Sequence, residues 1–211
     1  KRILFSPIKK FKNYLNEYKY KKEIEKIYKE NFIWSAQVGI VDDLGVERGS
    51  SMSNTILNSI SNAFKINLKS NKSKPDSKYF NIFPGEHYRL LAGLIEHEKP
   101  KTLIDIGTSS GMSSRIMLDY TNTDSEIFTF DLIKWNQFDS HLSKKDFKSR
   151  KFIQYLEDLS NKDIFKKHLS IIDKADIIFL DAPKDGVFEY LFIKNLVKSN
   201  LSLKKRLLIL D

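Results

Sequence analysis

The sequence of this 211-residue chain predicts an α/β fold, in which a mostly parallel β-sheet carries helices on both faces and follows a helical N-terminal region. Three observations predict it. Short apolar segments of strand length alternate with helical segments after residue 83, as in parallel sheets covered on both faces. Residues 1–68 instead carry apolar residues at helical spacing, and a Lys-, Ser- and Asn-rich stretch at 69–81 separates the two patterns.

The N-terminal segment is strongly basic. Residues 1–30 hold ten Lys or Arg against four Glu, which is six of the net nine positive charges. Apolar residues at Ile8, Phe11, Leu15 and Tyr18 have helical spacing, so we interpret this segment as an amphipathic helix with a solvated Lys-rich face. Nucleic-acid binding is disfavoured here, because the segment has no Arg cluster or Gly-aromatic motif.

A second helix is expected near residues 53–66, where Ile56, Leu57, Ile60 and Phe64 form an apolar stripe. Its start is expected at a capping serine, either Ser51 or Ser53. We therefore divide the chain into a helical extension with a linker, residues 1–80, and an α/β domain, residues 81–211.

Within the α/β domain, helical and strand segments are expected to alternate. A helix at 85–98 ends before Pro100, and further helices are expected at 111–120, 161–170 and 186–199. Strands are expected at 102–106, 126–131, 152–155, 176–181 and 206–211. Three of these strands end in aspartate and Asp105 stands one residue before the end of another, so we expect a polar ligand at the carboxyl edge of the sheet. The three are Asp131, Asp181 and Asp211.

The sequence Leu-Ile-Asp-Ile-Gly-Thr-Ser-Ser-Gly-Met-Ser-Ser at residues 103–114 is typical of a strand, a tight turn and a helix start. Gly107 permits the turn and the close approach of a ligand, and Gly111 relieves crowding where the helix begins. Asp105 is placed either to accept a hydrogen bond from a ligand amine or to hold the loop. A nicotinamide-dependent oxidoreductase typically carries the pattern Gly-x-Gly-x-x-Gly. Its middle glycine would stand where this chain has Ser109, which disfavours that alternative.

These residues resemble motif I of class I S-adenosylmethionine-dependent methyltransferases, in particular the catechol O-methyltransferase-like branch of bacterial O-methyltransferases. The resemblance continues through Phe-Thr-Phe-Asp at 128–131, Ile-Ile-Phe-Leu-Asp-Ala-Pro-Lys-Asp-Gly at 177–186 and Leu-Leu-Ile-Leu-Asp at 207–211, and it covers residues 82–211. It implies a Rossmann-like sheet of seven strands. Five are visible, so we expect the natural protein to continue past Asp211.

The resemblance also implies roles for individual residues. Asp131 would accept the ribose hydroxyls of S-adenosylmethionine, a geometry that also serves NAD. Asp158 would lie near the adenine, or would simply cap the helix that follows it. The full set of implied cofactor-binding residues is Asp105, Gly107, Thr108, Ser109, Gly111, Ser113, Asp131 and Asp158.

For catalysis, the resemblance implies that Asp181 binds a divalent cation together with Asp211, and that Lys184 deprotonates the acceptor hydroxyl. Hard oxygen ligands suit Mg²⁺ or a similar ion. Lys184 is equally compatible with an ordinary surface position. His87, in the first turn of the helix before the first strand, is either an acceptor-site base or a solvent-facing residue.

The sequence therefore predicts an S-adenosylmethionine-dependent methyltransferase that acts on an oxygen of a small molecule or sugar. A nicotinamide-dependent oxidoreductase and a non-enzymatic basic binding module remain as alternatives, and a homodimer is left open. The absence of cysteine excludes disulfides and thiolate metal sites. The apolar runs are too short to cross a bilayer, so we expect a cytoplasmic protein.

Overall fold

The computed structural model describes residues 46–68, 86–149, 151–183, 185–202 and 206–210. The chain divides after Val46, and the description concerns the unit Glu47–Asp211. The predicted helix that contains Ile8 and Phe11, the linker at 69–81, Lys184 and Asp211 all lie outside the described residues.

Five parallel strands form one sheet in the order β3-β2-β1-β4-β5. The strands are β1 (Thr102–Ile106), β2 (Glu126–Phe130), β3 (Phe152–Tyr155), β4 (Ile177–Leu180) and β5 (Leu207–Leu210). The predicted Rossmann-like α/β fold is thus confirmed. Because the strand order reverses between β1 and β4, the crevice in which such sheets bind ligands opens at the carboxyl ends of these two strands.

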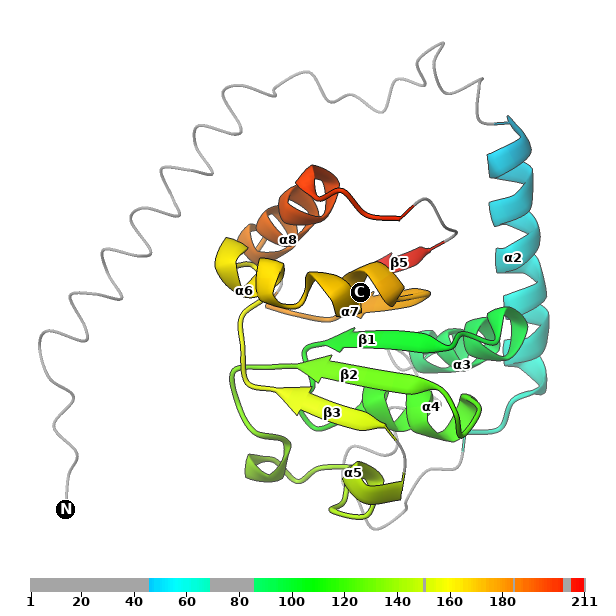
Figure 1. Ribbon diagram of the computed structural model, residues 1–211. Helices are drawn as coiled ribbons and strands as arrows, with labels where there is room; N and C mark the ends of the chain where they lie inside the picture. The colour runs from blue at the N-terminus through cyan, green and yellow to red at the C-terminus, as the bar shows by residue number, and fades with distance from the viewer. Residues whose placement is uncertain (1–45, 69–85, 150, 184, 203–205, 211) are drawn as a thin grey trace, which may run out of the picture. The chain divides into compact units, whose positions relative to one another are not determined.

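Helices cover both faces of the sheet (Figure 1). On one face lie α3 (Glu86–Glu98) and α4 (Met112–Tyr120), and on the other lie α6 (Lys162–Lys167), α7 (Leu169–Lys174) and α8 (Val187–Lys198). The single helix predicted at 161–170 is two helices, since the backbone of His168 leaves the helical region between α6 and α7. Within the described residues, no helix is long and apolar enough to span a membrane.

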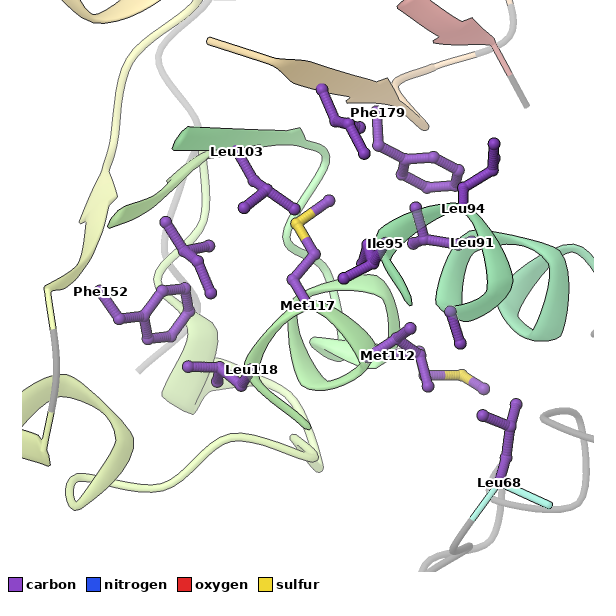
Figure 2. Close-up of a cluster of buried hydrophobic side chains, with 14 of the residues drawn as sticks. Leu68, Leu91, Leu94, Ile95, Leu103, Met112, Met117, Leu118, Phe152 and Phe179 are labelled. Atoms are coloured by element: carbon purple, nitrogen blue, oxygen red, sulfur yellow. The ribbon is translucent and has the colours of Figure 1, made fainter. Parts of the chain in front are cut away.

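The core is split between the two faces because successive strand residues point to opposite sides. Leu103 of β1 joins Leu91, Ile95 and Met117 from α3 and α4 in one buried cluster, part of which Figure 2 shows. The next residue, Ile104, belongs to the opposite cluster with side chains of α6, α7 and α8. The three central strands, β1, β2 and β4, are buried almost throughout, as their runs of apolar residues predict, whereas the edge strands β3 and β5 are only partly buried.

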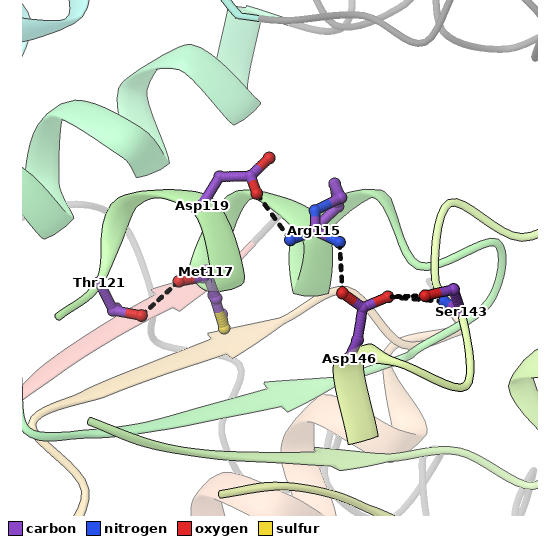
Figure 3. A network of polar contacts seen from close by, with 6 residues as sticks. All are labelled: Arg115, Met117, Asp119, Thr121, Ser143 and Asp146. Carbon is purple, nitrogen blue, oxygen red and sulfur yellow. Dashed lines mark hydrogen bonds and ion pairs between the residues drawn. The ribbon is translucent and has the colours of Figure 1, made fainter. Parts of the chain in front are cut away.

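The connection from β2 to β3 contains only a short 3-10 helix, η3 (Trp135–Gln137), and a single turn, α5 (Asp146–Ser149). Two contacts fasten it to the α4 face of the sheet. The ring of Phe147 stacks on Phe152 of β3 with centroids 4.5 Å apart. Arg115 of α4 bonds to Asp146 at 2.8 Å and to Asp119 at 2.6 Å, as Figure 3 shows. The sequence pattern did not predict η3 or α5.

Helix α2 (Val46–Lys65) begins earlier than predicted, so Ser51 and Ser53 lie within it and the predicted capping position is wrong. Its buried side is formed by Thr55, Ser59 and Ala63, which face α3. A Cβ on Gly93 of α3 would lie 2.2 Å from the Ser59 carbonyl oxygen, so only glycine permits this approach of the two backbones. The apolar stripe predicted for this helix lies on a neighbouring side of it. The side chains of this stripe are exposed, namely Ile56, Leu57, Ile60 and Phe64.

Candidate functional site

The candidate site lies where β1 passes through the residue 107–111 loop into α4. Gly107 has φ +102°, and a Cβ there would lie 1.9 Å from the carbonyl oxygen of Asp181. The sequence analysis assigned this glycine to ligand approach. The structure adds a stricter reason, which is that the loop after β1 touches the backbone after β4. Any side chain at Gly107 would therefore disturb the fold itself.

Gly111 ends the loop and begins α4. It has φ +80° and occupies the position before the first helical residue, and a Cβ there would meet the Leu142 side chain at 2.5 Å. The prediction that this glycine relieves crowding at the helix start agrees with that geometry. Ser109 also takes a left-handed conformation, with φ +43°. The loop thus uses three left-handed residues to reverse the chain between strand and helix.

Asp105 stands one residue before the carboxyl end of β1, below the loop, and is fully buried. Its carboxylate accepts hydrogen bonds from the hydroxyl of Ser113 at 2.9 and 3.0 Å and from that of Ser114. Burial raises the pKa of Asp105 to about 7, although the two serine hydroxyls oppose the shift. Of its two predicted roles, this geometry favours holding the loop over accepting from a ligand amine.

A buried chain of polar groups extends this support across the sheet. The hydroxyls of Thr108 and Thr129 lie 2.6 Å apart, and the Thr129 hydroxyl is 3.5 Å from the Asp105 carboxylate. The Gln154 amide donates to Thr108 at 3.1 Å and accepts from the Trp135 backbone N–H at 3.0 Å. Thr108 and Ser113 therefore serve the loop from beneath, and their side chains are buried.

Asp131 lies at the carboxyl end of β2, beside the loop. One carboxylate oxygen accepts from the Ser109 N–H at 2.8 Å and the other accepts from the Ile133 N–H at 2.9 Å. Each oxygen has about two acceptor positions, so these bonds leave one on each oxygen for a further donor. The half-buried position of Asp131 is compatible with the predicted acceptance of two ribose hydroxyls.

Exposed apolar side chains surround Asp131, and the sequence analysis did not identify them. Leu132 is 71% exposed, and Ile133 and Leu156 are also exposed. The Asp131 N–H donates to the Tyr155 carbonyl at 3.1 Å, so the residues after β2 and β3 lie side by side. The sequence does carry a signal for two of them, because Leu132 and Ile133 form an apolar pair directly after the strand-end Asp131.

Asp158 follows β3 and its carboxylate accepts from the Ser160 N–H at 2.8 Å. This bond forms a turn before α6, while Asn161 caps that helix. Beside it, Glu157 bonds to Lys167 and to the buried His168. These contacts hold the pKa of Glu157 below its usual value, first through Lys167 and then through His168. They tie the end of β3 to α6 and α7, and the sequence analysis did not predict them.

The predicted catalytic residues are only partly described. Asp181 is half-buried directly after β4, and its N–H continues the ladder to the Ile106 carbonyl at 2.8 Å. Leu180 pairs in register with Leu210, the residue before Asp211. Lys184 and Asp211 themselves lie outside the described part, so the paired metal site stays a prediction. No cluster of three or more potential metal ligands occurs among the residues that the structure describes.

His87 lies against the sheet rather than over the loop. Its ring is stacked on Phe179 of β4 with centroids 6.5 Å apart, and the ring of Tyr88 is 3.9 Å away. Phe179 stands two residues before Asp181, so His87 approaches the site from the α3 face. Its role as a base remains a prediction.

The fold and this site define a Rossmann-like α/β domain, in which the loop between β1 and α4 lies against Asp131 and the backbone of Asp181. No protein-family model matches the chain, and no curated protein shows significant similarity to it.

Proposed function

We propose that this chain is an S-adenosylmethionine-dependent methyltransferase that acts on an oxygen of a small molecule or sugar. The observation that carries the proposal is the hydrogen bond of the Asp131 carboxylate to the 107–111 loop, where the backbone of Asp181 also contacts Gly107, with the exposed apolar side chains Leu132 and Ile133 next to Asp131. A nucleoside needs both features, because its ribose donates hydrogen bonds and its base requires an apolar contact.

The charge of the site favours a cationic ligand over a pyrophosphate. In a nicotinamide-binding loop, backbone N–H groups receive the phosphates. Here the Ser109 N–H is already bonded to the Asp131 carboxylate at 2.8 Å, and a pyrophosphate at that position would meet like charge. A sulfonium and an amino group would instead be attracted. The carboxylates thus support S-adenosylmethionine rather than NAD.

The residues present also fit the proposed reaction. S-adenosylmethionine supplies an electrophilic methyl group. Asp131 would hold the ribose through the acceptor positions that its bonds to Ser109 and Ile133 leave open. Lys184, in its neutral form, would accept the proton of the acceptor hydroxyl, and Asp181, directly after β4, would hold a divalent cation that favours this ionisation. Asp105 would keep the loop in position from below.

Calorimetry with S-adenosylhomocysteine tests the proposal. We expect micromolar binding that Asp131→Ala weakens at least about tenfold, since hydrogen bonds to a charged group contribute roughly 1.5–3 kcal/mol each. Asp131→Asn keeps one accepting oxygen, so its affinity for S-adenosylhomocysteine should lie between that of the wild type and that of Asp131→Ala. The control is Asp124→Ala, which removes an exposed aspartate at the start of β2, away from the site.

The same titration separates the alternatives. Binding of NAD in place of S-adenosylhomocysteine would assign the site to an oxidoreductase. Binding of a short nucleic-acid duplex alone would favour the basic binding module. Unchanged S-adenosylhomocysteine affinity in Asp131→Ala would contradict the assignment of the ribose site.

A further inference from the structure

Helix α2 presents an apolar surface that no other element of the described residues covers. Five large apolar side chains on one side of the helix are between 37% and 82% exposed, whereas the side that faces α3 consists of small residues. The five are Met52, Ile56, Leu57, Ile60 and Phe64. We call this set the α2 stripe. Exposure of this extent along one helix is typical of an interaction surface.

The spacing of the α2 stripe suits another helix. Four of its members recur every four residues, at 52, 56, 60 and 64. Such i±4 rows form the ridges that interdigitate when two helices pack, and two copies of the same row are complementary in this way. A helix that meets its own copy across a two-fold axis forms the interface that is commonest in homo-oligomers.

The lack of charge along most of α2 favours one kind of partner over the others. The sequence from Gly49 to Phe64 contains no charged residue. A nucleic acid or an anionic membrane surface requires basic residues beside the apolar ones, and an acidic or basic protein requires the opposite charge. A second copy of the same uncharged stretch requires neither, and the two stretches carry no like charges that would repel.

The exposed area of the α2 stripe is of the order that a dimer interface buries. At about 150–200 Å² for a fully exposed large side chain, the exposed fractions of the five residues leave on the order of 500 Å² of apolar surface per chain. A standard interface buries about 800 Å² on each partner. Exposed polar residues beside the stripe, such as Ser53 and Ser61, would supply part of the remainder.

We propose that the α2 stripe is a homodimer interface, in which α2 of one protomer packs against α2 of a second copy. Thr55 of α2 bonds to Glu98 at 3.1 Å, near the end of α3 that precedes β1. This places α2 towards the amino ends of the strands, away from the candidate site, so the dimer would leave the site open.

Sedimentation velocity between about 1 and 200 μM tests this proposal. We expect the intact chain to dimerise in this range, and Leu57→Glu or Phe64→Glu to weaken the dimer at least about tenfold, because each change places two charges in the interface. Circular dichroism should show an unchanged fold, since these side chains are 63% and 82% exposed. The control is Val197→Glu, which alters a 78% exposed apolar residue on α8 and should leave the dimer intact.

Two outcomes would overturn the proposal. A chain that stays monomeric over the whole range would mean that something other than a second copy covers the stripe. A dimer that forms equally well in both stripe variants would place the interface elsewhere.

Discussion

Replacing Asp105 by asparagine should change how the stability of the protein depends on pH. Burial raises the pKa of this carboxyl group from 3.8 to about 7. Between these two values the folded protein retains a proton that the unfolded chain has lost. The free energy of unfolding therefore falls as pH rises through this window, and the stabilising contribution is complete only below about pH 4.

The size of the effect follows from the shift in pKa. Each unit corresponds to about 1.4 kcal/mol, so full ionisation of Asp105 costs the folded state on the order of 4 kcal/mol. Asparagine has nearly the same shape and cannot ionise. Its amide can donate to a serine hydroxyl while its oxygen accepts from another, because the hydroxyls of Ser113 and Ser114 can rotate.

Urea denaturation of both proteins at pH 5, 6, 7 and 8 measures this effect. The difference in unfolding free energy, Asp105→Asn minus wild type, should increase with pH by up to about 1.4 kcal/mol per unit and level off above pH 7. Other titrating groups cancel in the difference. Asp124→Asn, an exposed change, should show no such trend. A difference that stays constant from pH 5 to 8 would refute the reasoning.

Two further predictions concern the loop and the edge of the sheet. Gly107→Ala should lower the unfolding free energy by more than about 2 kcal/mol, because its Cβ would meet the Asp181 carbonyl, whereas Gly186→Ala, with open space around it, should cost about 1 kcal/mol. Urea denaturation compares them. If a cation bridges Asp181 and Asp211, EDTA should abolish methyl transfer; activity that persists in excess EDTA would leave deprotonation to Lys184 without a metal.

The strands were the most predictable part of the fold. Their boundaries agree with the structure to within one residue, because each strand is a run of four or five residues, rich in apolar side chains and bounded by turn residues, too short for a typical helix. The break at His168 was missed since both halves keep helical periodicity. The short elements η3 and α5 depend on tertiary contacts, among them the stack of Phe147 on Phe152, and have no local signal.

The α2 stripe shows why periodicity alone does not identify the core. The pattern correctly indicated a helix, but an apolar side can face a partner as well as the interior. The side that is buried, through Thr55, Ser59 and Ala63, has little apolar signal. Its contact depends on Gly93, which stands more than 30 residues away in the sequence.

In the site, the sequence identified the positions but not the direction of each side chain. Asp105 and Asp131 both occur near strand ends. Alternation along β1 turns Asp105 towards α4 and the interior, whereas Asp131 follows the last residue of β2 and remains at the surface. Only the structure distinguishes the buried carboxylate of Asp105 from the partly exposed one of Asp131.

The contact between α2 and α3 bears on where this domain can be divided experimentally. A linker-based boundary near residue 81 would separate α2 from the sheet. It would uncover the Gly93 surface of α3 and remove Thr55, a hydrogen-bond donor to Glu98. Ala92 and Ile95, both buried, flank that surface. Fragments intended for crystallisation or isotope labelling should therefore begin before Val46, so that the helix is retained together with the sheet.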